Sequence, residues 1–238
     1  MQIIFDARAI QDHFPGIGRY AYNLLSALPA QMATDDQLLA WRDARASNTR
    51  FDWWPLTERG VKLIDYPTSV FGAANLLRQP HTTGDLLHFP YYMRPLRTSL
   101  PTVTTIHDVF TMVYPQLAPS AQSRVAIRLF HALAIRSSSR IITVSRSAAA
   151  DLARYFPASR GKTVTIPEAP ESIFTPQHAS QVEAVRAKYQ LPPHFALFVA
   201  SNKPHKNLVR LVEAWQITTR DLRLGIRDSV RSTQSPIS

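Results

Sequence analysis

Two histidines lie at the carboxyl ends of predicted strands, where an imidazole could hydrogen-bond a hydroxyl group of a ligand. His107 follows the β-branched run Thr102–Ile106, and His88 lies in the short apolar run Leu86–Phe89. In open α/β sheets ligands bind at the carboxyl ends of strands, so this position favours a functional role for His107 over a structural one. The same argument is weaker for His88. Asp108 would either fix the tautomer of His107 or cap the segment that follows.

A loop with two glycines precedes the first predicted helix. Gly16 and Gly18 would let the backbone approach a ligand closely, and the free N–H groups of the helix N-terminus could bind an anion. Together with Ala21 they match a dinucleotide-binding pattern, but Gly16 lies ten positions after Asp6, where the first strand ends. That pattern turns directly after its strand, so a dehydrogenase-type site is disfavoured. A ligand role and a loop-shaping role are equally compatible with the two glycines.

Two lysines lie in a turn between an apolar run and a predicted helix. Lys203 and Lys206 lie in Ser201–Asn207. Two lysines at a helix N-terminus would suit a diphosphate group. A solvated basic turn explains them equally well.

The predicted helix Pro119–Arg136 carries a basic stripe beside an apolar one. Arg124, Arg128 and His131 follow the spacing i, i+4, i+7. The apolar stripe consists of Val125, Leu129, Phe130, Leu133 and Ala134. We expect an ordinary surface helix whose apolar side packs on a sheet. Peripheral contact with an anionic membrane surface is the alternative.

The elements that position these residues alternate between strand and helix. Strands are predicted over 2–6, 37–41, 61–66, 86–89, 102–106, 140–144 and 162–166. Helices are predicted over 18–28, 71–77, 119–136 and 145–155, the last with Ser145 as its N-cap. This alternation predicts an α/β fold with a parallel sheet covered on both faces.

Composition limits the class of protein. The 238 residues are 45% hydrophobic and 18% charged, as in a soluble globular protein. The chain has no cysteine, which excludes a disulfide framework, a thiolate nucleophile and a Cys-ligated metal. Residues 1–6 do not read as a signal peptide, so we expect a cytoplasmic location. The net charge of +10 would suit nucleic acid, but no recognition motif accompanies it, and we expect no nucleic-acid partner.

The composition changes after residue 170. Residues 171–192 are predicted to be a proline-rich linker with a short helix over 182–189. Residues 193–238 would begin a second α/β unit, with a strand over 195–200 and a helix from Asn207 to Trp215. Residues 222–226 could form one more strand, and 227–238 show no periodicity. Residues 1–170 are therefore expected to be the one complete domain.

Taken together, the motifs resemble the retaining glycosyltransferases of family 4, also called group 1. The resemblance runs from Met1 to about Trp215. It rests on Asp6-Ala7-Arg8 with Gly16-Ile17-Gly18-Arg19-Tyr20, on Thr105-Ile106-His107-Asp108, on Arg140-Ile141-Ile142-Thr143-Val144-Ser145 and on Phe198–Leu208. The Lys203-Pro204-His205-Lys206-Asn207 turn is most similar to bacterial mannosyl- or glucosyltransferases of polysaccharide assembly.

The resemblance implies a GT-B fold, in which two Rossmann-like domains face each other across a cleft. The first domain would hold a glycan or lipid-linked acceptor and the second a nucleotide-diphosphate sugar. His107 would lie beside the transferred sugar, while Gly16, Gly18, Lys203 and Lys206 would contact the donor diphosphate. Fixed cations would replace a metal ion, so no metal or other cofactor is expected. The remaining positions implied, for the acceptor or for support of the site, are Arg19, Tyr20, His88 and Asp108.

Two departures from the family pattern bear on activity. The arginine that normally accompanies Lys206 is replaced by Ser201 or Asn202, and the family's Glu-x7-Glu segment beyond Trp215 is missing. We therefore expect a C-terminally truncated enzyme with little or no turnover of its own. The alternatives are a non-catalytic acceptor-binding module and the product of a pseudogene.

Overall fold

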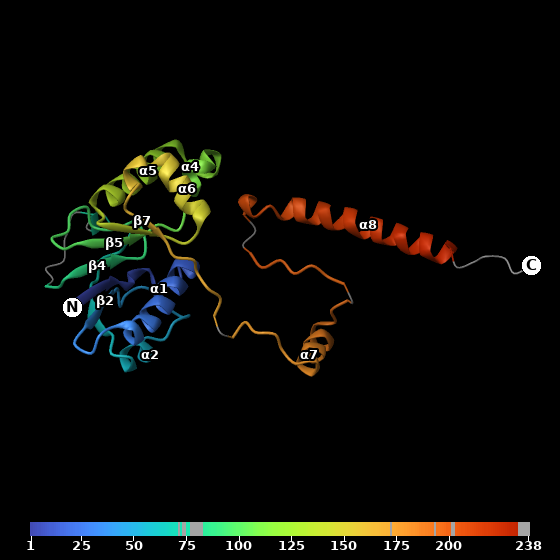
Figure 1. Cartoon of the computed structure of the whole chain (residues 1–238), viewed down its shortest axis with the longest axis horizontal. Helices are drawn as coiled ribbons and strands as arrows, with labels where there is room; N and C mark the ends of the chain where they lie inside the picture. Colours follow the sequence, from blue (N-terminus) through green and yellow to red (C-terminus); the bar gives the residue numbers. More distant parts are fainter. Residues whose placement is uncertain are drawn as a thin grey trace, which may run out of the picture. The chain divides into compact units, whose positions relative to one another are not determined.

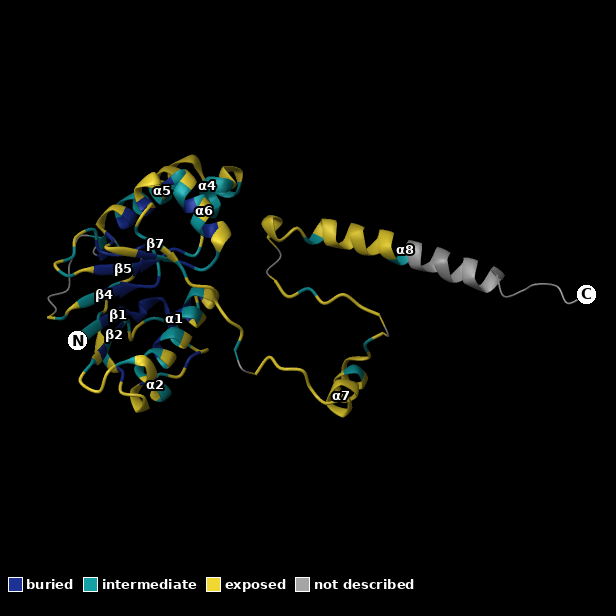
Figure 2. Cartoon of the chain, in the orientation of Figure 1, coloured by how far each residue is buried: buried dark blue, intermediate teal, exposed yellow. Residues whose placement is uncertain are grey.

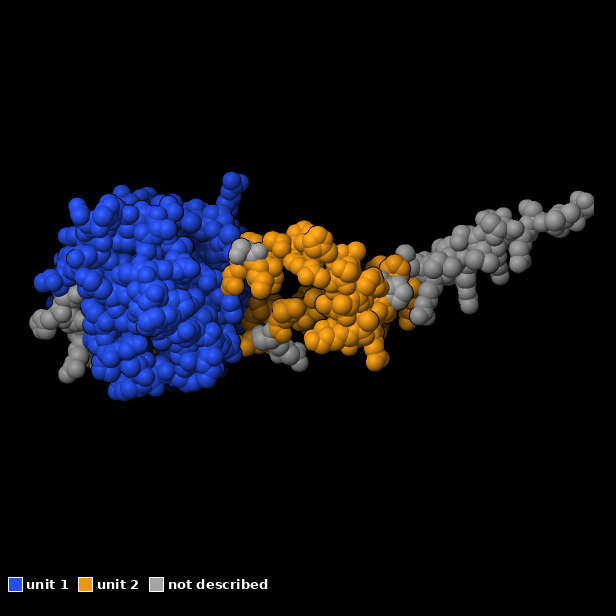
Figure 3. Space-filling view, turned by 90° about the horizontal axis from the view of Figure 1, so that it is seen from below, with its two compact units in different colours: residues 1–169 blue, residues 170–238 orange. Residues whose placement is uncertain are grey.

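The structure is a computed structural model of the chain. It describes residues 1–70, 72, 75–76, 83–171, 173–192, 194–200 and 203–232, with side chains described up to residue 220. Contacts divide the chain into two units, Met1–Ala169 and Pro170–Ser238 (Figure 3). The first unit contains the sheet and is the part that organises the site.

Seven parallel strands form one sheet in the order β3-β2-β1-β4-β5-β6-β7 (Figure 1). They are β1 (Gln2–Asp6), β2 (Gln37–Arg42), β3 (Lys62–Asp65), β4 (Leu86–Phe89), β5 (Thr102–Thr105), β6 (Arg140–Thr143) and β7 (Thr163–Thr165). The predicted strands of this unit and its Rossmann-like α/β class are thus confirmed. The chain winds from β1 to β3 in one direction and from β4 to β7 in the other. The switch point therefore lies at the carboxyl ends of β1 and β4, where such sheets bind ligands.

The helices of the first unit connect consecutive strands. They are α1 (Pro15–Ala27), α2 (Trp54–Glu58), α4 (Phe110–Val113), α5 (Ala121–Ser137) and α6 (Arg146–Tyr155). Ser145 caps α6 as expected, because its hydroxyl accepts a hydrogen bond from the backbone N–H of Ala148 at 3.0 Å. The helix predicted over 71–77 falls largely outside the described residues.

Helix α1 begins earlier than the sequence suggested. Proline fits the first turn of a helix because it lacks an N–H that would be unpaired there, and Pro15 starts α1. Gly16 and Gly18 consequently both lie inside the first turns of the helix. The prediction that Gly16 belongs to the preceding loop is wrong, whereas Gly18 lies in the helix, in agreement with the predicted range 18–28. On the inner side of α1, Ala21 and Leu25 are fully buried against Phe5 of β1. Figure 2 shows that buried residues are concentrated in the strands of the sheet.

Helix α5 packs through a different face from the one predicted. Its buried residues are His131, Ala134 and Ile135, whereas Val125 and Leu129 are 70% and 53% exposed. The His131 ring stacks on Tyr92, with ring centroids 3.7 Å apart. The histidine thus belongs to the packed side, and the two aliphatic residues belong to the outer side. The predicted apolar packing stripe is wrong for Val125 and Leu129.

The described residues of the second unit include two α-helices, α7 (Ala179–Tyr189) and α8 (Leu208–Ser232). The strand predicted over 195–200 is wrong, because these residues form no strand and Leu197 and Val199 are 78% and 85% exposed. A strand requires a neighbour for its backbone hydrogen bonds, and the described part of this unit offers none. The strand predicted over 222–226 is also wrong, since these residues lie in α8. Among the described residues, no helix has both the length and the apolar character needed to cross a bilayer.

Candidate functional site at the carboxyl edge of the sheet

Thr105, the last residue of β5, connects two predicted site residues. Its hydroxyl lies 3.1 Å from the hydroxyl of Tyr20 in α1 and 3.1 Å from Nε2 of His88 in β4. Thr105 is fully buried, and His88 packs edge-on against Phe5 of β1. The sheet order puts β4 beside β5, and Tyr20 of α1 reaches the last residue of β5. The sequence-predicted Tyr20 and His88 are therefore brought together through a threonine that the sequence did not single out.

His107 contacts this group through the ring of Tyr20. Its Nε2 is 3.1 Å from the carbonyl oxygen of Pro90, which follows β4, and its ring meets that of Tyr20 edge-on with centroids 4.8 Å apart. Its Nδ1 is 3.3 Å from Oε1 of Glu168. Tyr20, His88 and His107 thus form one cluster, as their positions at strand ends and in the adjoining helix would predict.

Glu168 is a member of this cluster that the sequence analysis missed. It follows β7 by three residues, near the end of the range 1–170 predicted for the first domain. A signal was available, because the carboxyl ends of parallel strands meet at one edge and Glu168 comes after the last predicted strand.

Burial keeps the deeper part of the cluster uncharged. It lowers the pKa of His88 to about 4 and raises the pKa of Tyr20 above its usual range. It also raises the pKa of Tyr91, which follows Pro90. At neutral pH these groups are therefore a neutral imidazole and two phenols. Such groups can donate hydrogen bonds to sugar hydroxyls and accept hydrogen bonds from them. The carboxylate of Glu168 lies at the exposed side of the cluster.

Two other predicted residues point elsewhere. Oδ1 of Asp108 accepts a hydrogen bond from the backbone N–H of Phe110 at 3.0 Å, at the start of α4. Asp108 therefore caps the segment that follows it and does not contact His107. The carboxylate near Nδ1 of His107 belongs to Glu168. The guanidinium of Arg19 lies over the ring of Phe51, with its Cζ 5.7 Å from the centroid.

The two glycines of α1 differ in their surroundings. A Cβ at Gly18 would lie 2.9 Å from the carbonyl oxygen of Ala9, so the missing side chain allows α1 to pack on the segment after β1. A Cβ at Gly16 would meet nothing within 4 Å. The role that the structure gives Gly18 is therefore close packing of helix and loop.

A buried ion pair follows β1. Arg8 is 1% exposed, and its guanidinium donates to both carboxylate oxygens of Asp6 at 2.8 and 2.6 Å. It also donates to the carbonyl of Thr68 and to Oδ1 of Asn75. The pair thereby ties the end of β1 to the segment after β3. The sequence motif Asp6-Ala7-Arg8 contributed to the resemblance, but this pairing was not predicted.

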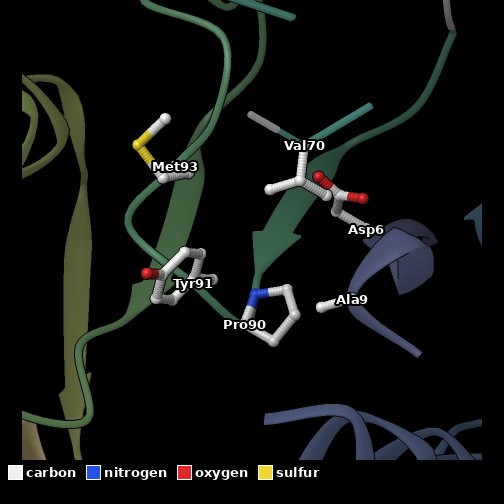
Figure 4. Close-up of a pocket in the computed structure, with 6 residues that line it drawn as sticks. All are labelled: Asp6, Ala9, Val70, Pro90, Tyr91 and Met93. Atoms are coloured by element: carbon white, nitrogen blue, oxygen red, sulfur yellow. The ribbon is translucent and has the colours of Figure 1, made fainter. Parts of the chain in front are cut away.

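A small pocket opens beside this pair at the ends of β1 and β4 (Figure 4). It is lined by Asp6, Ala9, Val70, Pro90, Tyr91 and Met93. Figure 4 shows Tyr91 and Met93 on one side and Asp6 with Ala9 on the other. Because Arg8 neutralises Asp6, the pocket is an apolar border of the site and not a charged one.

The predicted lysines belong to the second unit. Lys203 and Lys206 are both exposed, and Lys206 ends a 3₁₀ turn, Pro204–Lys206. Asn207 adopts a left-handed conformation with φ 57°, which turns the chain into α8. Ser201 and Asn202, the positions that replace the family's arginine, lie outside the described residues.

Comparison with protein families and curated proteins agrees with this geometry. The model of Glycosyltransferase Family 4 matches residues 15–169, which is most of the first unit. The O-antigen chain mannosyltransferase B of Escherichia coli is 26% identical over 246 residues. That match covers 94% of this chain and 62% of the relative, so the chain spans less than two thirds of the relative's length.

Solved structures with the same fold include Anabaena Alr3699/HepE in complex with UDP and glucose. It is 16% identical and has a TM-score of 0.51. The likeness covers 79% of this chain and 50% of that one. A second structure of the Anabaena protein, in complex with UDP, is 14% identical with a TM-score of 0.50. At these identities the likeness establishes the fold of the chain.

Proposed function

The chain belongs to glycosyltransferase family 4, and we propose that it is part of an enzyme that transfers a hexose with retention. The donor would be a nucleotide-diphosphate sugar carrying mannose or glucose, and the acceptor a glycan or a lipid-linked glycan. The E. coli relative's role as an O-antigen mannosyltransferase supports this choice of substrates. We further propose that the reaction takes place in the cytoplasm and needs no metal ion.

The observation that carries this proposal is the cluster around His107. Tyr20, His88 and Thr105 form an uncharged hydrogen-bonding group in which His88 and Thr105 are buried and Tyr20 is partly buried. His107 contacts the ring of Tyr20 and has one ring nitrogen within hydrogen-bonding distance of a backbone carbonyl. A site that binds a sugar needs such oriented donors and acceptors for hydroxyl groups. In the proposal His107 touches the transferred sugar, and the edge-on contact with Tyr20 fixes the orientation of the His107 ring.

We assign the diphosphate to Lys203 and Lys206. Both side chains are exposed, and the two residues stand five and two positions before Leu208, the first residue of α8. The departing nucleoside diphosphate gains negative charge in the transition state, and fixed cations stabilise it there. The two lysines would supply this stabilisation in place of a metal ion.

Saturation-transfer NMR with UDP-glucose and with GDP-mannose tests both assignments. We expect one of the two to bind saturably and inorganic pyrophosphate to compete with it. Lys203→Gln/Lys206→Gln should weaken binding roughly tenfold or more, because charge-assisted hydrogen bonds are lost. Lys62→Gln/Lys188→Gln removes two lysines elsewhere and should leave the affinity unchanged.

His107→Asn provides the matching test for the sugar. This variant should reduce saturation transfer to the protons of the sugar and leave saturation transfer to the protons of the nucleotide unchanged. If neither nucleotide sugar binds the wild-type chain saturably, the transferase proposal is rejected.

A second candidate function has one observation in its favour. Residues 195–200 form no strand and are largely exposed, so the segment preceding the lysine turn lacks the sheet that a nucleotide-binding domain would require. The chain could then serve as a non-catalytic acceptor-binding module. Saturable binding of an acceptor glycan by the wild-type chain, without binding of either nucleotide sugar, would favour this function.

A further inference from the structure

The pocket at the ends of β1 and β4 is too small for a whole small molecule. Its empty volume, with the open mouth included, is about 180 Å³. Sites that enclose a complete ligand have volumes of roughly 300–1,000 Å³. A ligand could therefore place one substituent in this pocket, while the rest of the ligand lay outside it.

The walls of the pocket favour an apolar substituent. Four of its six lining residues are buried and apolar, and they follow three different strands, β1, β3 and β4. These residues are Ala9, Val70, Pro90 and Met93. Tyr91 is half-buried and lies on the same side as Met93 (Figure 4). A charged substituent would lose its hydration against such walls without a compensating partner, whereas a methyl group would gain from burial there.

One polar group, the carboxylate of Asp6, also lines the pocket. Its Oδ1 accepts hydrogen bonds from the backbone N–H and Nε of Arg8 at 3.2 and 2.8 Å, and its Oδ2 accepts one from Nη2 of Arg8 at 2.6 Å. Among the described residues these are the donors to Asp6, and a carboxylate offers about four acceptor positions. Oδ2 therefore has room for one further donor, which a ligand could supply.

Arg8 also holds one wall of the pocket in place. Its guanidinium donates to Oδ1 of Asn75 at 2.8 Å, and the Asn75 amide donates to the backbone carbonyl of Val70 at 2.7 Å. Because these bonds position the Val70 wall before a ligand binds, binding does not have to order it.

The pocket adjoins the His107 cluster through Pro90. The carbonyl oxygen of Pro90 lies 3.1 Å from Nε2 of His107, and the same residue lines the pocket. A sugar ring in contact with His107 would therefore have a neighbouring ring substituent beside the pocket mouth.

We propose that this pocket binds the acetamido group of an N-acetylated hexosamine in the acceptor. The methyl group enters the apolar space, and the amide N–H donates to Oδ2 of Asp6. A 6-deoxy sugar also carries a methyl group but lacks the N–H, and a free amino sugar would bring a charge against the apolar walls. This assignment rests on the proposed function, because it takes the ligand beside His107 to be a glycan, and it adds the substituent that is selected there.

Saturation-transfer NMR of the full chain with four methyl glucosides tests the pocket. The probes differ at carbon 2, which carries an acetamido, a formamido, a butanamido or an acetyl ester group. The acetamido probe should bind most tightly and receive its strongest saturation at the acetyl methyl protons. The formamido probe lacks one methyl group and should bind about fourfold more weakly. The ester lacks the N–H and should bind roughly tenfold more weakly, because a hydrogen bond to a charged group is lost.

The ester probe also tests Asp6 in the wild-type chain, without a substitution that would break the ion pair with Arg8. Val70→Ala tests the walls, because it enlarges the pocket. The wild type should bind the butanamido probe more weakly than the acetamido probe, and Val70→Ala should bind it at least as tightly. Val61→Ala is the matched control, since Val61 is likewise 3% exposed but belongs to the core cluster of Leu56 in α2. It should keep the wild-type order of the probes.

Three outcomes would overturn the proposal. The first is a lack of saturable binding of the acetamido probe. The second is equal binding of the four probes by the wild type, which would mean that the pocket holds only water. The third is an unchanged order of the probes in Val70→Ala, which would place the acyl group elsewhere.

These assays use no nucleotide sugar, so they are independent of the test of transferase function. Saturable binding of a nucleotide sugar without a preference for the acetamido probe would reject the pocket assignment alone. A preference for the acetamido probe without binding of either nucleotide sugar would reject the transferase alone.

Discussion

Nδ1 of His107 lies 3.3 Å from Oε1 of Glu168, while Nε2 of the same ring lies 3.1 Å from the carbonyl oxygen of Pro90. A carbonyl oxygen only accepts hydrogen bonds, so the contact with Pro90 requires a proton on Nε2, and a hydrogen bond to the Glu168 carboxylate, which is also an acceptor, requires one on Nδ1. The contact with Glu168 becomes an ion pair whenever the imidazole is doubly protonated. Under the proposed function, a sugar hydroxyl that reached Nδ1 would have to replace Glu168 there.

We predict that Pro90 and not Glu168 sets the tautomer of His107. Long-range ¹H–¹⁵N correlation spectra of the wild type should show the neutral ring protonated at Nε2. Glu168→Ala should leave this assignment unchanged, because the Pro90 carbonyl is still in place. A neutral ring protonated at Nδ1 in either protein would contradict the hydrogen bond to Pro90.

Stability should fall as the pH is lowered from about 6.5 to about 4, in part because of His88. Burial lowers the pKa of His88 to about 4, so below its usual value near 6.5 the unfolded chain binds a proton that the folded chain does not. The stabilisation is complete above pH 6.5 and is lost on acidification, with about 2 kcal/mol lost by pH 4.5. Burial also lowers the pKa of His131, which acts in the same direction.

Urea unfolding at pH 7 and pH 4.5 measures this effect. His88→Gln, which can still hydrogen-bond Thr105, should reduce the difference in unfolding free energy between the two pH values by about 2 kcal/mol. Replacement of the exposed His178 by glutamine serves as the control and should leave the difference unchanged. An unaltered pH dependence in His88→Gln would show that His88 is not buried as described.

The two glycines of α1 should respond to alanine in opposite directions. Gly18→Ala would place a Cβ 2.9 Å from the Ala9 carbonyl and should lower the free energy of unfolding by about 1–3 kcal/mol. Gly16→Ala meets no atom within 4 Å and should raise it by about 0.5–1 kcal/mol, because the unfolded chain loses freedom. Equal effects in urea unfolding would refute the packing role assigned to Gly18.

The Asp6–Arg8 pair should matter far more than an exposed pair. Asp6→Asn leaves the guanidinium of Arg8 buried without its carboxylate, and this should lower the free energy of unfolding by about 3–5 kcal/mol. Arg50→Gln breaks an exposed pair with Asp12 and should have a small effect by comparison. Similar losses in both variants, compared by urea unfolding, would mean that the Asp6–Arg8 pair is accessible to water.

The sequence was sufficient to predict the sheet of the first unit and the edge at which the site lies. Apolar and β-branched runs alternate with helical patterns, and a parallel sheet then puts His88 and His107 at one edge. Thr105 was missed because threonine is common in strands, so one threonine in a β-branched run gives no sign of a further role. Glu168 was missed because its contact with His107 depends on the path of an irregular segment, for which periodicity gives no information.

Predictions failed where tertiary contacts override a local pattern. On α5, the aromatic environment of His131 turns the histidine inward and leaves Val125 exposed, which a count of apolar spacings does not reveal. The run over 195–200 has the composition of a buried parallel strand, but composition does not provide the neighbouring strand. In both cases the missing information concerns what the segment packs against.

Hydrogen exchange should distinguish the residues 195–200 from a true strand of the same chain. In β5, residues 103 and 104 pair with both β4 and β6, and their amides should exchange slowly. Residues 195–199 are without a strand partner in the described part of the chain, so their amides should exchange at nearly the rate of an unfolded peptide. Slow exchange at 195–199 in the purified chain would mean that this apolar run is paired in solution, as in a nucleotide-binding sheet. Adding a nucleotide sugar should leave the fast exchange unchanged if the chain is an acceptor-binding module, and should slow it if binding orders this segment.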